Sequence, residues 1–169
     1  VESFMGYLPN AHILMAQNPS LLIAFSEFAR TIFQSEYLNL ELKQLIALAS
    51  SLSSGCKYCQ AHTSHGAERA GVEVKKIADI LNYENSNTYD DKERAILDLA
   101  FAAGNNPNQS TKKHFEKLKK YCSEKEIVEV VSVISLFGYL NRWNDTFGTL
   151  LENVPGTFVE TELIPLGWT

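Results

Sequence analysis

The chain has 169 residues, enough to bury a core without metal or disulfide staples. Its formal charge of −5 at pH 7 and the lack of a basic stripe exclude nucleic acid as an expected partner. Three cysteines are too few for a disulfide scaffold, and no apolar run is long enough to span a membrane. We therefore expect one cytoplasmic domain over residues 1–169, without a membrane partner.

Apolar residues recur at steps of three and four along most of the chain, the period of amphipathic helices. This pattern predicts helices over residues 19–32, 39–52, 56–70, 74–81, 91–103, 111–121 and 125–147. Asn39 and Ser123 can cap helix starts, while Gly55 and Gly71 supply ends. The prolines and glycines after Gly148 indicate an irregular tail from about residue 149. The sequence predicts an all-α fold in a compact helical subunit.

One stretch of the chain resembles another. A shift of 85 positions aligns residues 41–52 with residues 126–137 and places Cys59 on Asn144. An internal duplication, in which only the first copy carries thiols, is one interpretation. The other is that any two amphipathic helices align on their apolar residues.

The segment GCKYCQAHTSH, residues 55–65, holds two of the three cysteines. In a first helical turn Cys56 and Cys59 lie on one side, where unpaired N–H groups and the helix dipole favour a thiolate. This indicates a reactive dithiol, although cysteines can also simply fill a core. Zinc ligation by this pair with His62 and His65 would require the helix to break, because four ligands would fan across the helix. A thioredoxin-like site would need a preceding strand. We expect no metal.

The two histidines of the segment differ in position. At about 100° per residue, His62 lies beside Cys59, whereas His65 points away from Cys56. His62 has the pKa range of a general base or proton relay, and the alternative is an ordinary hydrogen-bonded helix histidine. We interpret His65 as structural or facing solvent.

Residues 39–71, with the Cys-x-Tyr-Cys motif and the following histidine, resemble the carboxymuconolactone decarboxylase and alkylhydroperoxidase D-like family. The resemblance implies an all-helical subunit that assembles into trimers or hexamers, and a peroxidase that needs no cofactor. It also implies that Cys59 attacks the peroxide, that Cys56 resolves the sulfenic acid into a disulfide, and that a thiol or dithiol donor restores the pair.

The sequence departs from the family at both proton-relay positions. Gln44 stands where a glutamate is usual, twelve positions before the first cysteine, and Thr63 stands where a histidine is usual. Glutamine can orient a water or a group but cannot exchange a proton as a carboxylate does. Our hypothesis is that His62 replaces the family histidine, and that Glu41 or Glu129 replaces the carboxylate.

The expected function is thus an antioxidant, thiol-dependent peroxidase that reduces hydrogen peroxide or organic hydroperoxides through Cys56 and Cys59. Two alternatives stay open. One is the family's decarboxylase branch, which acts on a lactone, and the other is a redox-sensing switch whose dithiol changes an interaction.

Overall fold

A computed structural model describes residues 5–168 of the chain. The prediction of an all-α fold is confirmed, and no strand occurs among the described residues. The α-helices are α2 Asn10–Met15, α3 Pro19–Phe33, α4 Leu40–Ser54, α5 Lys57–Ala70, α6 Val74–Ala78, α7 Asp91–Gly104, α8 Lys112–Leu118, α9 Glu124–Phe147 and α10 Asn153–Phe158. Within this part of the chain, no helix combines the length and the apolar character needed to cross a membrane.

The helix starts follow the capping signals in the sequence. The Asn39 side chain accepts a hydrogen bond from the Leu42 N–H at the start of α4, and Ser123 forms a capping box with Glu126 at the start of α9. Gly55 ends α4 in the left-handed conformation, with φ of 83°. Because α4 stops there, Cys56 becomes the N-cap residue of α5.

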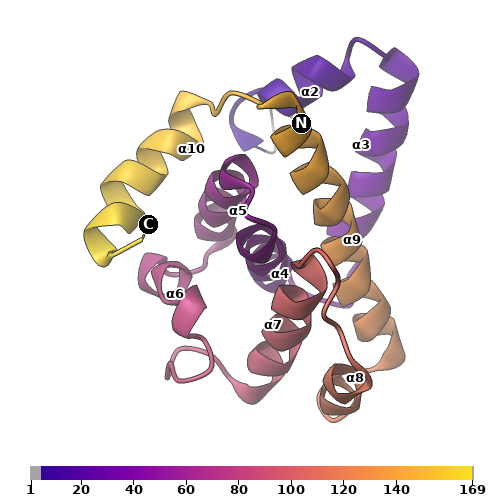
Figure 1. Cartoon of the computed structure of the whole chain (residues 1–169), viewed down its shortest axis with the longest axis vertical. Coiled ribbons are helices and arrows are strands. Elements are labelled where there is room, and N and C mark those ends of the chain that lie inside the picture. The colour runs from indigo at the N-terminus through magenta and orange to yellow at the C-terminus, as the bar shows by residue number, and fades with distance from the viewer. Residues whose placement is uncertain (1–4, 169) are drawn as a thin grey trace.

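Helix α4 occupies the middle of the molecule and packs against α5, α7 and α9 (Figure 1). Leu45, Ile46 and Leu48 are at most 1% exposed. Burying a side chain of this size stabilises the fold by roughly 1.5–3 kcal/mol. The wide apolar arc of α4 therefore makes it the helix around which the others are arranged.

A buried ion pair joins α4 to α9 and to the chain after α3. Lys43 Nζ lies 2.6 Å from Glu129 Oε1, and the two side chains are 1% and 4% exposed. The ammonium also donates hydrogen bonds to the carbonyls of Ile32 and Ser35, at 3.0 and 2.5 Å, and Glu129 Oε2 accepts one from Leu38 N. Each charge is thus paired and hydrogen-bonded, which burial of an ion requires.

The prediction of an irregular tail is wrong. After α10 the chain continues as a π-helical turn over Val159–Leu163 and a 3₁₀ turn over Ile164–Leu166, and it runs beside α5 and α6 (Figure 1). Pro155 lies in the first turn of α10, where a missing N–H breaks no helical hydrogen bond. Phe158 and Leu163 are buried, so tertiary packing stabilises this segment.

Candidate active site: a buried dithiol beside a histidine–glutamate pair

The two cysteines lie at the N-terminus of α5. Cys56 Sγ accepts a hydrogen bond of 3.4 Å from the Cys59 backbone N–H. Both residues are free thiols, and they are 0% and 2% exposed. The unpaired N–H groups and the dipole of the first turn favour an anion at this place. The local geometry therefore stabilises a negative charge on Cys56.

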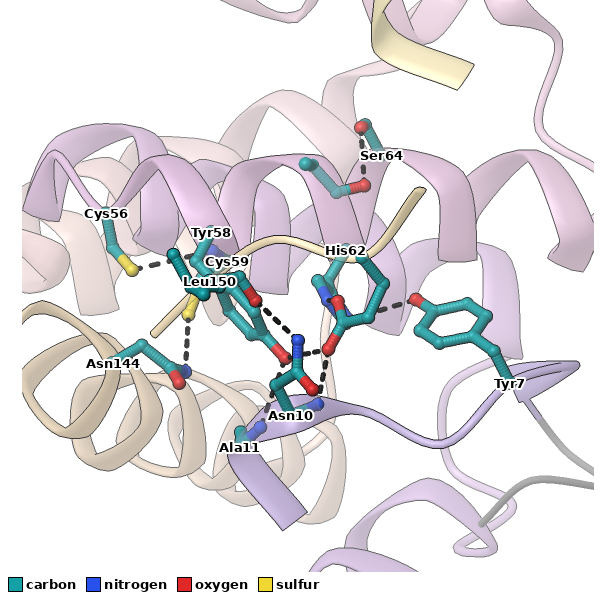
Figure 2. A network of polar contacts seen from close by, with 12 residues as sticks. Tyr7, Asn10, Ala11, Cys56, Tyr58, Cys59, His62, Ser64, Asn144 and Leu150 are labelled. Atoms are coloured by element: carbon teal, nitrogen blue, oxygen red, sulfur yellow. Dashed lines mark hydrogen bonds and ion pairs between the residues drawn. The ribbon is translucent and has the colours of Figure 1, made fainter. Parts of the chain in front are cut away.

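Cys59 has a different set of neighbours. The Asn144 side chain, from α9, donates a hydrogen bond of 3.4 Å from Nδ2 to Cys59 Sγ (Figure 2). The hydrogen bond with Cys56 and burial raise the pKa of Cys59, while the bond from Asn144 opposes that rise. Two adjacent sulfurs cannot readily both be charged. The adjacent Cys56 and burial therefore disfavour a negative charge on Cys59 in the reduced pair.

His62 lies one helical turn after Cys59 and is almost fully buried. Its Nδ1 is 3.0 Å from the Tyr7 hydroxyl, and its Nε2 is 2.6 Å from Glu152 Oε2. The ring stacks on Tyr58, with 4.2 Å between the ring centroids. Figure 2 shows Tyr7 reaching this histidine from the segment before α2, while Asn10, at the start of α2, donates a hydrogen bond to the Leu150 carbonyl.

Glu152 is the carboxylate of the site. It is the N-cap residue of α10, and its Oε1 accepts hydrogen bonds from the Tyr58 hydroxyl, at 2.8 Å, and from Asn10 N. Burial by itself would raise the pKa of Glu152, but the bonds from His62, Asn10 and Tyr58 outweigh it and lower the pKa to about 2. An ionised carboxylate can only accept, so Nε2 of His62 donates to Glu152, and Nδ1 is the ring nitrogen that meets the Tyr7 hydroxyl.

The structure corrects the sequence-based hypothesis for the carboxylate. Glu41 lies near Gly71 at the far end of α5, where it lines a cavity of about 450 Å³. Since Gly71 is nine residues beyond His62, that end is roughly 13 Å away along the helix. Glu129 is bound by Lys43. Neither glutamate pairs with His62, and Glu152, ninety positions from His62 in the sequence, takes that place.

Comparisons with known proteins identify the family. The model of the carboxymuconolactone decarboxylase family matches residues 19–100. A cysteine-to-alanine variant of the debrominase Bmp8, in complex with 2,3,4-tribromopyrrole, is 35% identical over 94% of this chain and 85% of that chain, with a TM-score of 0.90. The chain belongs to the carboxymuconolactone decarboxylase family.

Two further solved structures share the fold of this chain. A protein of unknown function from Agrobacterium tumefaciens, assigned to AhpD-type antioxidant defence, has a TM-score of 0.74 at 23% identity, over 81% of this chain and 94% of that chain. A peroxidase-related protein with an alkylhydroperoxidase AhpD core, from Ralstonia eutropha, has a TM-score of 0.80 at 19% identity, over 91% and 82%. No curated protein sequence matches the chain.

The two positions at which this family member departs from the expected motif are both buried. Gln44 packs against Gly66, two turns beyond Cys59, so closely that a Cβ on that glycine would lie 2.7 Å from Gln44 Oε1. The Thr63 hydroxyl donates to the Cys59 carbonyl at 2.7 Å. Among the described residues, neither side chain hydrogen-bonds to His62 or Glu152, and Thr63 has no group that could act as a base.

The structure also bears on His65 and on the zinc alternative. The His65 ring packs against Phe158 of α10, at 5.4 Å, and burial lowers its pKa. Between residues 5 and 168, no three histidine, cysteine or acidic side chains come together as metal ligands would.

The residue that sequence reasoning missed is Glu152. It stands in a segment that looked irregular, and no motif links it to the cysteines. Tyr7 and Asn144 carried no chemical signal either, although the shift of 85 positions had aligned Asn144 with Cys59, the residue whose sulfur it contacts. The duplication itself stays a prediction.

Proposed function

We propose that the protein is a thiol-dependent peroxidase that reduces a small hydroperoxide with the electrons of Cys56 and Cys59. The observation that carries this proposal is the pair of free thiols in one helical turn, with a histidine one turn further along the same helix that is hydrogen-bonded to a carboxylate. Membership of the family, which includes enzymes, supports it, as does the shared fold with AhpD-type proteins.

The first step is attack on the peroxide. The Cys59 thiolate bonds to the terminal oxygen of ROOH, the O–O bond breaks, and RO⁻ leaves and takes a proton to become ROH. We assign that proton to His62, because it lies one helical turn after Cys59 and its ring is held in place by hydrogen bonds to Glu152 and Tyr7. Cys59 is left as a sulfenic acid.

The second step closes the cycle. The sulfur of Cys56 attacks the sulfur of Cys59, hydroxide leaves and is protonated to water, and a disulfide forms. A thiol or dithiol donor then returns two electrons. In total, one ROOH and two thiols give ROH, water and a disulfide.

The cover over the sulfurs favours a small substrate. Ala11, Leu140 and Trp143 pack around the two cysteines, which leaves their side chains essentially unexposed. Hydrogen peroxide needs little space, whereas a bulky hydroperoxide would have to displace one of these side chains. We therefore propose hydrogen peroxide and short alkyl hydroperoxides as the substrate class.

Thiol counting tests the proposal. One equivalent of hydrogen peroxide should remove two thiols, and excess peroxide should be consumed over many turnovers when a dithiol reductant is present. Cys59→Ser should abolish the reaction, and Cys56→Ser should leave a trapped sulfenic acid. Cys122→Ser is the matched control, because Cys122 lies outside the dithiol and burial raises its pKa. A single oxidation without turnover would favour a redox switch, and no loss of thiols would overturn both.

The debrominase relative favours a second candidate. The same dithiol could reduce a carbon–bromine bond, since R–Br and two thiols balance to R–H, hydrogen bromide and a disulfide. The support is the 35–36% identity to Bmp8, whose variant binds 2,3,4-tribromopyrrole. Bromide release from a panel of brominated pyrroles, measured beside peroxide consumption with the same reductant, separates the two. Release that requires Cys56 and Cys59 and exceeds peroxide turnover would make debromination the function.

A further inference from the structure

Asn144 has an amide whose orientation is fixed. The residue is 2% exposed, and its Nδ2 donates to the Leu140 carbonyl at 3.0 Å and to Cys59 Sγ at 3.4 Å. An amide nitrogen carries two protons, so each bond uses one. Because a backbone carbonyl can only accept, Leu140 holds the nitrogen, and not the oxygen, on the side of the sulfur.

Each sulfur of the pair consequently has its own N–H donor. The Cys59 backbone N–H points at Cys56 Sγ, and the Asn144 amide points at Cys59 Sγ (Figure 2). A hydrogen bond from an N–H group stabilises a thiolate more than a neutral thiol. The first donor belongs to the helix backbone and is present in any side-chain variant, whereas the second comes from one side chain of α9.

The remaining charges around Cys59 oppose ionisation there. Cys56, in the same turn, and Asp145 of α9 both disfavour a negative charge on Cys59. Attack by Cys59 requires a negative charge on its sulfur, which these two neighbours disfavour. Asn144 is the side chain whose hydrogen bond to Cys59 acts in the other direction.

We propose that Asn144 is a further catalytic residue, which contacts the reacting sulfur and stabilises the thiolate on Cys59 so that this sulfur can attack. The inference rests on the proposed dithiol cycle. It adds α9 to the elements that supply catalytic side chains, which are otherwise α5 and the segment before α10.

The buried amide of Asn144 lowers the stability of the fold. Asn144 Oδ1 is buried and has no hydrogen-bond partner among the described residues. A buried acceptor without a donor destabilises a folded chain, so an apolar side chain of the same size should be tolerated at this position. A purely structural role for the amide predicts the opposite, a loss of stability when it is removed.

The test measures ionisation of Cys59 directly. In a Cys56→Ser background the only reactive thiol of the pair is Cys59, and its rate of alkylation by iodoacetamide between pH 5 and 10 gives its ionisation midpoint, with peptide mass spectrometry to separate it from Cys122. Adding Asn144→Leu should raise the midpoint by about one pH unit, a tenfold lower thiolate fraction near neutral pH. Thermal unfolding should change little. In the chain with both cysteines, Asn144→Leu should slow oxidation by hydrogen peroxide by roughly tenfold.

Asn141→Leu is the matched control. Asn141 lies one turn earlier on α9 and is equally buried, but its amide donates, at 3.5 Å, to the Ser50 carbonyl and to no sulfur. This variant should leave the alkylation midpoint of Cys59 unchanged. An equal midpoint for Asn144→Leu and its parent, or an equal shift in both asparagine variants, would overturn the inference.

A second substitution covers the case in which Asn144→Leu does not fold. Asn144→Asp has the same shape but places a carboxylate at the sulfur, so it should raise the midpoint further than loss of the donor alone, and an unchanged midpoint would again overturn the inference. Because alkylation does not depend on turnover, the result can be read even if the parent protein consumes no peroxide. Failure of the proposed function and failure of this inference are therefore distinguishable.

Discussion

Among the described residues, two buried base–carboxylate pairs, Lys43–Glu129 and His62–Glu152, differ in the groups that surround them. Lys43 and Glu129 are enclosed, and four backbone groups, of Ile32, Phe33, Ser35 and Leu38, complete their hydrogen bonds. His62 and Glu152 are nearly as buried, at 9% and 12% side-chain exposure, but their partners include the hydroxyls of Tyr7 and Tyr58. The first pair is surrounded by main chain and the second by groups that can themselves exchange protons.

The difference separates a structural ion pair from a candidate relay. A lysine ammonium held by three carbonyls and a carboxylate has no acceptor site to offer, and it fixes the end of α3 against α4 and α9. A histidine with one nitrogen on a carboxylate and the other on a hydroxyl can take up or release a proton without moving. The histidine of the second pair also lies one helical turn from Cys59, on the same helix.

The largest effect that we expect is on activity. His62→Ala should lower peroxide-dependent turnover by about 10²–10⁴-fold, the usual contribution of a positioned acid or base, with a small change in thermal stability. His65→Ala removes a histidine one turn further on the same helix and should keep the parent rate, as should Glu41→Gln. Steady-state peroxide consumption with a dithiol reductant checks all three. Turnover of His62→Ala at the parent level would show that the relay assignment is wrong.

The opposite pattern is expected at the other pair. Lys43→Met leaves the Glu129 carboxylate buried without its cation, and the free energy of unfolding should fall by about 3–5 kcal/mol. The double variant Lys43→Met with Glu129→Leu should regain most of that loss, since no charge stays buried. Urea unfolding measures both.

A more exposed pair serves as the control for that comparison. Lys76 and Glu93 are also 2.6 Å apart, but 21% and 19% exposed, and Lys76→Met should cost less than about 1 kcal/mol. If the two lysine variants lost equal stability, burial would not be what distinguishes the structural pair.

The smallest effect concerns pH. The pKa of Glu152 is about 2 in the folded chain against an ordinary value of 4.5, so the unfolded chain binds the proton more readily. The stabilisation is fully present above about pH 4.5 and is lost as the pH falls towards 2. After screening by solvent we expect about 1 kcal/mol. Urea unfolding at pH 6, 4.5 and 3 should show a gap between parent and Glu152→Gln that narrows with acidity, and a constant gap would contradict it.

Much of the fold could be predicted from local signals. Asn39, Gly55 and Ser123 marked helix ends because caps act through bonds to neighbouring residues, which a sequence displays directly. The same local reasoning placed Cys56 and Cys59 in a first helical turn. It failed in the tail, where Pro155 and Gly156 suggested irregular chain, because burial of Phe158 and Leu163 outweighs local propensity there.

The sequence by itself determined the helices between residues 19 and 147, the dithiol and the position of His62 on the same helix, since all three follow from spacing along one element. Only the tertiary structure decided which carboxylate meets His62 and which donor meets Cys59. Glu152 and Asn144 come from segments 90 and 85 positions away, and the contacts depend on how α5 packs against α9 and against the chain before α10. Spacing within a helix determines which way each side chain points, but only packing between helices brings side chains from distant segments together.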